Sequence, residues 1–279
     1  MLKRVLTGIL SEDESSQLIS SFDTIGDIAI MKVPDLVIRK KEDIGNAILQ
    51  NVKHIHTVLR QIGPVTGEYR LRGLEYLAGE DKTTTLHKEH GCVYEVDLSK
   101  VYFSPRLSEE RNRIATQIAG TDPTIEVNMF SGVGPFSILI AKGNPNATIY
   151  SIESNPDGYE LMIRNSRLNK VEGKIIPILG DAASKVKENL TGVADHVLMP
   201  LPEESHNYLG HAVLALKPGG GIIHYYRNIK QSDNMKDEIE DELAAHISGP
   251  WEVTATRIVS DVGPGWVQVV TDVNVRGSS

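Results

Sequence analysis

Cysteine, aromatic residues and long apolar runs are all scarce in this chain of 279 residues. The single cysteine, Cys92, cannot form an intramolecular disulfide, and the nine histidines show no zinc-site spacing. The sequence therefore predicts no metal site and a reducing compartment, the cytoplasm. No run approaches the roughly 20 apolar residues that cross a bilayer, and the N-terminal MLKRVLTGIL lacks the apolar stretch of a signal peptide. We expect a soluble protein with no membrane contact.

Basic residues are fewer than acidic ones, which gives the chain a net charge of −8. A chain that binds nucleic acid needs positive potential on its contact face, so the total argues at first against such a partner. The deficit is uneven, since residues 1–120 carry a net −1 and residues 121–279 a net −7. Basic residues gather locally in the first part, at Arg39, Lys40 and Lys41, at Arg70 and Arg72, and at Arg106, Arg111 and Arg113. Solvated surface and an anionic ligand both stay open for these clusters.

From residue 124 onward, short apolar runs alternate with helix-length segments, which is typical of βαβ units on a parallel sheet. We expect strands at 124–130, 147–153, 174–182, 194–202 and 221–227, and helices at 132–144, 155–171, 206–220 and 232–247. Two further β-rich runs, 251–260 and 266–275, are joined by Asp-Val-Gly-Pro-Gly with no helix between them. They predict an antiparallel hairpin at one edge of a seven-stranded, Rossmann-like sheet.

The first hundred residues predict a small α+β domain instead. A strand is expected at 25–33, a helix at 43–61 and a strand at 91–99, whereas His87 and His90 lie in a polar segment that resembles a turn. A helix that begins near Leu107, with Ser108 as its N-cap, leads into the sheet domain. We place the boundary between a domain of residues 1–105 and one of residues 106–279.

A glycine loop follows the first strand of the sheet domain and opens a helix. Gly132 and Gly134 allow the backbone to approach a ligand closely, but Ser137 stands where a dinucleotide fingerprint has its third glycine. Glu153 ends the next strand about 20 residues later, where a carboxylate can bind both hydroxyls of a ribose. A ribose-bearing cofactor therefore fits better than a pyrophosphate.

The end of the third strand adds a further polar group. There Asp181 can accept from an adenine amino group, while Ala182 offers a backbone N–H. Together with the glycine loop and the acidic residue after the second strand, this pattern favours S-adenosylmethionine over a nicotinamide cofactor. The sequence thus predicts a class I methyltransferase fold, α/β and Rossmann-like, preceded by the small α+β domain.

Longer strings carry a family resemblance across roughly residues 65–275. NMFSGVGPFSI, VYFSPRLSEERNRIA and VLMPLPEESHNYL resemble the archaeal and eukaryotic tRNA (guanine37-N1)-methyltransferases. The resemblance implies S-adenosylmethionine as cofactor and tRNA as partner, and it predicts no protein partner. A sister family, the wybutosine-pathway aminocarboxypropyl transferases, lacks the arginine of FSPRL and the proline after the second loop glycine. Arg106 and Pro135 therefore favour methyl transfer.

The resemblance also implies roles for individual residues. Glu110 takes the N1 proton of guanine, Arg70 faces O6, and Arg106, four residues before Glu110, helps to position the reacting pair. Without this resemblance, Arg106 and Glu110 would instead be interpreted as an ion pair on the surface of a helix. The residues expected to bind the cofactor are Phe103, Arg106, Asn128, Phe130, Gly132, Val133, Gly134, Glu153, Ser154, Asn155, Asp181, Ala182 and Pro200.

Three departures from the family pattern widen the range of activities. Pro200 replaces an asparagine and resembles the branch that methylates carbon 7 of a tricyclic wyosine precursor, and Asn128 stands where an aspartate is common. The family's N-terminal module that contacts the outer tRNA corner is expected to be missing. The alternatives to guanine N1 methylation are therefore C7 methylation, aminocarboxypropyl transfer, and RNA binding without catalysis.

Overall fold

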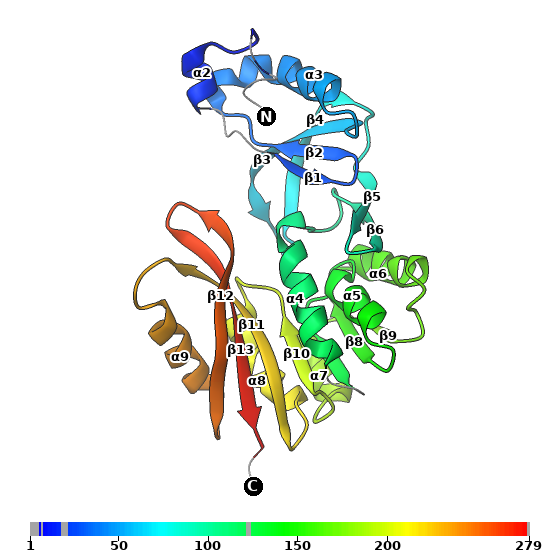
Figure 1. Cartoon of the computed structure of the whole chain (residues 1–279), viewed down its shortest axis with the longest axis vertical. Helices are drawn as coiled ribbons and strands as arrows, with labels where there is room; N and C mark the ends of the chain where they lie inside the picture. The colour runs from blue at the N-terminus through cyan, green and yellow to red at the C-terminus, as the bar shows by residue number, and fades with distance from the viewer. Residues whose placement is uncertain (1–5, 7, 18–21, 121–123, 278–279) are drawn as a thin grey trace. The chain divides into compact units, whose positions relative to one another are not determined.

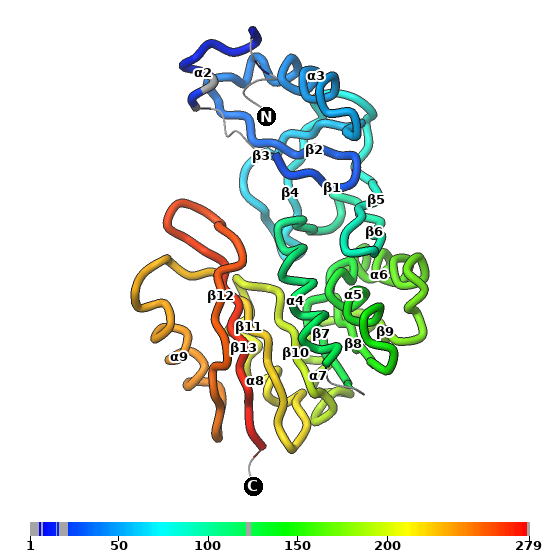
Figure 2. The backbone as a smooth tube through the Cα atoms, viewed as in Figure 1, coloured from blue at the N-terminus to red at the C-terminus, as the bar shows by residue number. Residues whose placement is uncertain are grey.

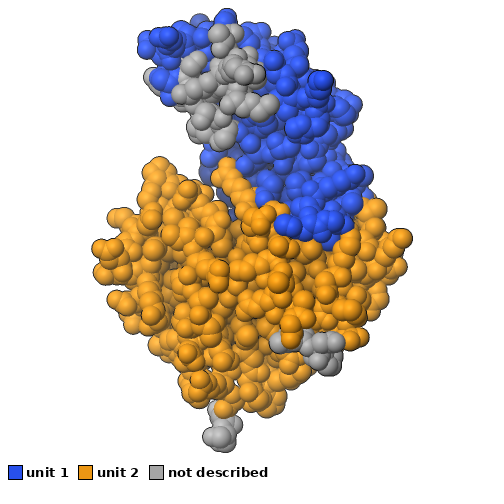
Figure 3. Space-filling model, in the orientation of Figure 1, with its two compact units in different colours: residues 1–105 blue, residues 106–279 orange. Residues whose placement is uncertain are grey.

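A computed structural model describes residues 6, 8–17, 22–120 and 124–277. The first residues of the N-terminal segment, which is expected not to be a signal peptide, lie outside the described ranges. The chain divides into two compact units, unit 1 (residues 1–105) and unit 2 (residues 106–279), which are coloured separately in Figure 3. No helix in the described ranges is long and apolar enough to cross a membrane.

Unit 1 is built on a four-stranded sheet of order β1-β2-β3-β4 and a separate β5-β6 hairpin. Its core lies where the buried face of α3 packs against β3 and β4, with Ile44, Ile48 and Val58 fully buried. The elements are α2 (Glu12–Gln17), β1 (Asp23–Ile25), β2 (Ile28–Met31), η1 (Asp35–Lys40), α3 (Lys41–Asn51), β3 (Thr57–Thr66), β4 (Leu71–Gly79), β5 (Thr84–Glu89) and β6 (Cys92–Asp97).

Three predictions for unit 1 are wrong in detail. The strand expected at 25–33 is the tight β1–β2 hairpin, because Gly26 adopts a φ of 57° and reverses the chain. The helix expected at 43–61 ends at Asn51, and the β-branched run after it forms β3. His87 lies on β5 rather than in a turn, and its Nδ1 accepts a hydrogen bond from the N–H of Gly26 (3.1 Å).

Unit 2 contains a seven-stranded sheet of order β12-β13-β11-β10-β7-β8-β9. The five strands from β9 to β11 are parallel. At one edge β13 runs antiparallel to β11, and β12 pairs antiparallel with β13 to form the terminal hairpin (Figure 1). The order reverses between β7 and β10, which is where open α/β sheets bind ligands. The strands are β7 (Ile125–Asn128), β8 (Thr148–Glu153), β9 (Ile175–Leu179), β10 (His196–Met199), β11 (Gly220–Lys230), β12 (Trp251–Gly263) and β13 (Trp266–Arg276).

Helices cover both faces of this sheet, as the backbone trace in Figure 2 shows. One face packs against α7, α8 and α9 in a largely apolar core around Val197, Leu209 and Leu243. The other face carries α4, α5 and α6. The helices are α4 (Ser108–Ala119), α5 (Pro135–Gly143), α6 (Pro156–Leu168), α7 (Ala182–Asn189), α8 (Ser205–Ala215) and α9 (Met235–His246), with η2 (Pro105–Leu107) ahead of α4. The predicted fold class is confirmed.

Two local details of unit 2 differ from the sequence prediction. Ser108 is the first residue of α4 rather than its N-cap, and Leu107 at the cap position makes no side-chain bond. The short helix α7 was not predicted, because its start overlaps the run assigned to the third strand. Its N-cap is Asp181, whose carboxylate accepts from the N–H of Ser184 (2.9 Å).

Candidate active site

The glycine loop joins the end of β7 to the start of α5. Both predicted glycines have left-handed backbones, with φ 54° at Gly132 and 86° at Gly134. A side chain at Gly134 would come within 3.0 Å of Met162 on α6, whereas one at Gly132 would meet no protein atom within 4 Å. Gly134 therefore permits tight packing against α6, and Gly132 leaves open space on the side where a ligand can approach.

Glu153, the last residue of β8, lies directly against this loop. Its Oε2 accepts from the N–H of Gly132 (2.6 Å) and its Oε1 from the N–H of Asn155 (2.8 Å). Burial raises the pKa of Glu153, although these N–H groups act in the opposite direction. The N–H of Ser154 also donates to this carboxylate, so one of its four acceptor positions is left for a ribose hydroxyl.

Asp181 lies after β9 and shares its carboxylate between a helix cap and an aromatic residue. The Tyr208 hydroxyl donates to its Oδ2 (3.2 Å), and the Tyr208 ring meets Phe130 edge-on at 4.9 Å. Burial would raise the pKa of Asp181, but hydrogen bonds from Ser184 and Tyr208 hold it below its usual value. Phe130 follows β7, so Tyr208 connects the ends of two strands.

The remaining predicted cofactor residues of unit 2 lie on the same edge. Asn128 ends β7 but is fully buried, and its Nδ2 donates to Ser137 Oγ (3.0 Å) while its Oδ1 accepts from the N–H of Phe130 (3.3 Å). Asn155 caps α6 by accepting from the N–H of Asp157. Val133 and Ala182 are buried, Ser154 is exposed, and Pro200 directly follows β10. The amide of Asn128 therefore holds the loop together.

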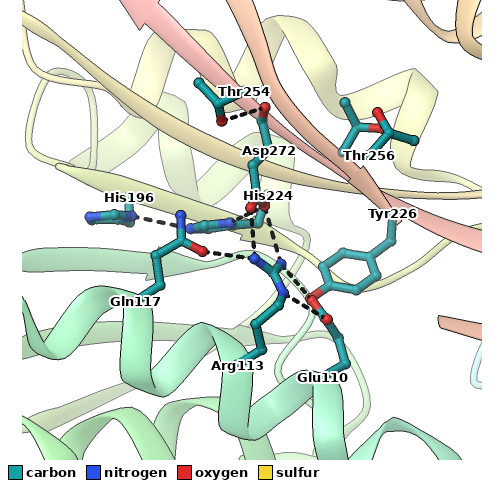
Figure 4. Close-up of polar contacts among 10 residues, drawn as sticks. Glu110, Arg113, Gln117, His196, His224, Tyr226, Thr254, Thr256 and Asp272 are labelled. Atoms are coloured by element: carbon teal, nitrogen blue, oxygen red, sulfur yellow. Dashed lines mark hydrogen bonds and ion pairs between the residues drawn. The ribbon is translucent and has the colours of Figure 1, made fainter. Parts of the chain in front are cut away.

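Glu110 occupies the first turn of α4 and is buried, with only 7 % of its surface exposed. Arg113 donates to both of its oxygens, from Nη2 to Oε1 (2.8 Å) and from Nε to Oε2 (2.9 Å). The Tyr226 hydroxyl donates to Oε1 (2.9 Å), as Figure 4 shows. Three of the four acceptor positions of the carboxylate are thus used. The fourth, on Oε2, has no partner among the described residues.

Tyr226 places this carboxylate close to the glycine loop. The last pair of β10 joins Met199 to Tyr225, so Tyr226 lies just beyond the carboxyl end of β10. Its ring also contacts Phe136 at 5.8 Å, in the first turn of α5. Glu110, the glycine loop, Glu153 and Asp181 therefore share the carboxyl edge of one sheet.

Other predicted residues are not brought to this edge within unit 2. Arg70 and Phe103 belong to unit 1, where the Arg70 guanidinium lies 4.4 Å from the Tyr102 ring centre and Phe103 packs edge-on against His87. Arg106 lies in η2, before α4 begins. The expected i, i+4 relation on one helix is therefore wrong, and the ion pair of Glu110 is formed with Arg113.

Four residues of this edge were not predicted as site residues: Tyr208, Arg113, Tyr226 and Asp272. Tyr226 is fully buried, and its hydroxyl has a polar partner 116 positions earlier in the chain. Such pairings have no local spacing, so no sequence pattern could have identified them. The arrangement offers a carboxylate with an open acceptor position beside an open loop, and a buried carboxylate in the first turn of a helix. It suits a nucleoside cofactor and a reaction that needs a proton acceptor.

No cluster of three or more metal-ligating side chains occurs in the part of the chain that the structure describes.

Comparison with known proteins gives relatives that modify position 37 of tRNA but differ in the reaction. The tRNA (guanine(37)-N(1))-methyltransferase Trm5b of Pyrococcus abyssi is 36% identical over 259 residues, covering 92% of this chain and 75% of that protein. The tRNA 4-demethylwyosine(37)-methyltransferase Taw21 of Saccharolobus solfataricus is 37% identical over 257 residues, covering 91% and 93%.

Solved structures agree in fold. The complex of aTrm5 with tRNALeu superposes with a TM-score of 0.85 at 36% identity, covering 99% of this chain and 78% of that one. TYW2 of M. jannaschii in complex with AdoMet gives a TM-score of 0.65 at 25% identity, covering 92% and 100%. Residues 2–83 match the TYW2 N-terminal domain, and residues 85–247 match the TRM5/TYW2 methyltransferase domain. The chain belongs to the TRM5/TYW2 methyltransferase family.

Proposed function

We propose that this protein transfers the methyl group of S-adenosylmethionine to N1 of guanosine 37 in tRNA. The observation that carries the proposal is the Glu110 carboxylate at the carboxyl edge of the sheet, with one acceptor position open on Oε2. Relatives that match most of the chain have this activity, and the similar protein aTrm5 was solved in complex with tRNALeu.

The residues of unit 2 match the needs of the cofactor. Glu153 retains an acceptor for a ribose hydroxyl, Asp181 lies where an adenine amino group can donate, and Gly132 leaves room for close approach. When bound, S-adenosylmethionine supplies an electrophilic methyl group on a sulfonium. Glu110 accepts the proton that leaves guanine N1 as that nitrogen forms its bond to the methyl carbon.

The negative charge that develops on guanine O6 needs a cation. Arg70 is proposed for this part because of its place in the family pattern, and Arg106 is proposed to orient the base. Loss of a donor to such a developing charge typically costs about 2.7–4 kcal/mol of transition-state stabilisation. Arg70 also has a positive φ of 54° and a nearby aromatic face, both of which restrict its side chain.

C7 methylation of a tricyclic wyosine precursor is the second candidate function. Pro200 follows β10 where the guanine-specific pattern has an amide side chain, and Taw21 is as similar to this chain as Trm5b is. A carbon nucleophile attacks before its proton leaves, so the reaction makes less demand on Glu110.

A two-substrate assay tests the proposal. The protein is incubated with S-adenosylmethionine and either tRNA carrying guanosine 37 or tRNA carrying 4-demethylwyosine 37, and the digested nucleosides are analysed by mass spectrometry. We expect N1-methylguanosine from the first tRNA. Product from the tricyclic tRNA alone would replace the proposal by the second candidate, and a heavier aminocarboxypropyl adduct would contradict both.

A further inference from the structure

A row of buried polar side chains crosses the α4 face of the sheet, where an apolar layer is usual. It runs from His196 on β10 through His224 on β11 to Asp272 on β13, and from there to Arg113 on α4 (Figure 4). His224, Asp272 and His196 are all less than 5 % exposed. The row ends at Glu110, the residue proposed to accept the proton.

Arg113 is the point where this row meets Glu110, and it makes five hydrogen bonds. Two go to Glu110, two to Asp272 (2.7 and 3.3 Å), and one to Gln117 Oε1 (2.8 Å). A guanidinium has five N–H donors in a rigid plane, so every donor of Arg113 is used. Its plane, and with it the orientation of the Glu110 carboxylate, is therefore fixed from two sides.

Asp272 is held in turn by the sheet. His224 Nδ1 donates to its Oδ1 (2.7 Å), and its backbone lies in the register of β13 between β11 and β12. Although burial alone would raise the pKa of Asp272, hydrogen bonds from His224 and Arg113 hold it well below the ordinary value. An ionised Asp272 thus faces Arg113 throughout the neutral pH range.

A contribution to folding stability is a weak explanation for the buried cluster of Glu110, Arg113 and Asp272. Two carboxylates share one guanidinium in a buried layer, and the desolvation cost of such groups often equals or exceeds what their attraction returns. Asp272 as a rigid second partner of Arg113 can instead fix the position of the Glu110 carboxylate. Small misplacements of catalytic groups reduce rates strongly.

We propose that Asp272 is a positioning residue that acts through Arg113 to hold the Glu110 carboxylate in the one orientation that leaves Oε2 open. This inference rests on the proposed function, in which Glu110 accepts the N1 proton. Asp272 itself touches neither substrate nor cofactor in this scheme.

The test is a double-mutant cycle on the full chain. Asp272→Asn, Glu110→Gln and the double variant are compared in single-turnover methylation of guanosine-37 tRNA, with cofactor affinity measured by calorimetry. Asp272→Asn replaces an acceptor by a donor that faces the N–H groups of Arg113 or His224. We expect its rate to fall by roughly 10- to 100-fold with cofactor affinity unchanged. In the Glu110→Gln background the same substitution should change the rate less than twofold.

Glu252→Gln is the matched control. Glu252 forms an exposed ion pair with Arg276 (3.1 Å) on the same β12–β13 hairpin, away from the row. Its rate should equal that of the wild type, which shows that charge removal on this hairpin is harmless by itself. If Asp272→Asn does not fold, as judged by circular dichroism, Asp272→Ser takes its place in the same cycle. That change removes the charge that faces Arg113 and shortens the side chain, and the same rate loss is expected.

The outcomes separate the two levels of the argument. An equal fold-loss from Asp272→Asn in both backgrounds overturns the positioning role while leaving the activity intact. A wild-type protein that methylates no guanosine-37 tRNA overturns the proposed function first, and the positioning role with it. A wild-type rate in Asp272→Asn also rejects the inference.

Discussion

The Glu153 carboxylate accepts a 2.6 Å hydrogen bond from the backbone N–H of Gly132, across 21 positions of sequence. This contact fixes the acidic side chain of β8 against the glycine loop before any ligand arrives. The carboxylate proposed to bind the ribose is therefore preorganised, which would reduce the ordering cost of cofactor binding.

Removal of this carboxylate should weaken cofactor binding. Hydrogen bonds to a charged group contribute about 1.5–3 kcal/mol each, so Glu153→Ala is expected to raise the Kd for S-adenosylmethionine at least tenfold. Asp181→Asn is expected to have a smaller effect. Asparagine still caps α7, and it presents a donor to the adenine amino group only if its amide is turned. Isothermal titration calorimetry measures both.

Glu160→Ala serves as the control for that experiment, because Glu160 lies exposed on α6. Its Kd should match that of the wild type. Unchanged affinity in both Glu153→Ala and Asp181→Asn would mean that the cofactor binds elsewhere.

Tyr208 should contribute to the same pocket through its ring more than its hydroxyl. Tyr208→Phe removes the 3.2 Å hydrogen bond to Asp181 and retains the edge-on contact with Phe130. We expect less than a threefold rise in Kd for Tyr208→Phe. Tyr208→Ala loses an aromatic pair worth about 0.5–1.5 kcal/mol together with the apolar area, and should raise Kd about tenfold or more. Equal values for the two variants would argue against a role for the ring.

Periodicity was sufficient to predict the sheet of unit 2 because each βαβ unit carries its own local signal. It failed in unit 1 where the signal is tertiary. Residues 52–61 continue an apolar pattern that suits a helix, but Val58 and Leu59 pair with β2 and β4, and that pairing determines β3. The β1–β2 hairpin depends on one left-handed glycine inside an apolar run, which composition alone conceals.

The residues of the candidate site also fall into those that the sequence could place and those that it could not. Gly132, Glu153 and Asp181 could be placed from sequence because parallel strands bring their carboxyl ends to one edge. The partners of Glu110 could not, since Arg113 was counted only among basic residues and Asp272 lies 159 positions further on. Only the packing of α4 on β11 and β13 brings these groups together.

Glu126 should make stability depend on pH. It is fully buried on β7, neither of its carboxylate oxygens has a hydrogen-bond partner among the described residues, and burial with the nearby negative charge of Asp195 raises its pKa to about 7. Between the unfolded pKa near 4.5 and the folded value, the folded state keeps a proton that the unfolded chain has released. The free energy of unfolding therefore falls as pH rises through this window.

Glu126→Gln removes this titration. The difference in free energy of unfolding, variant minus wild type, should be about 1–3 kcal/mol larger at pH 8 than at pH 4. Urea unfolding of both proteins at both pH values measures it. His196, whose pKa burial lowers to about 4, titrates in both proteins and cancels in the difference. The same stability difference at pH 4 and pH 8 would show that Glu126 does not titrate as described.

Binding of tRNA should weaken as salt rises, despite the net charge of −8, because contacts with phosphates release counterions. Arg39 of unit 1 is exposed, whereas the neighbouring Lys40 is paired with Glu14 (2.7 Å). Arg39→Ala should lower affinity and reduce the slope of log K against log salt by about one. Lys40→Ala should change that slope less. Filter binding between 50 and 300 mM salt, a range over which screening by salt increases, measures both slopes. An association that does not depend on salt would count against these contacts.

The chemistry assigned to Glu110 is tested most directly by the single-turnover rate of Glu110→Gln on tRNA that carries guanosine 37. Glutamine keeps the shape of the side chain and cannot take the N1 proton. We predict a rate about 10²–10⁴ times lower than that of the wild type, with tRNA and cofactor affinities nearly unchanged. A rate within twofold of the wild type, with N1-methylguanosine still formed, would contradict the role of Glu110 as the proton acceptor.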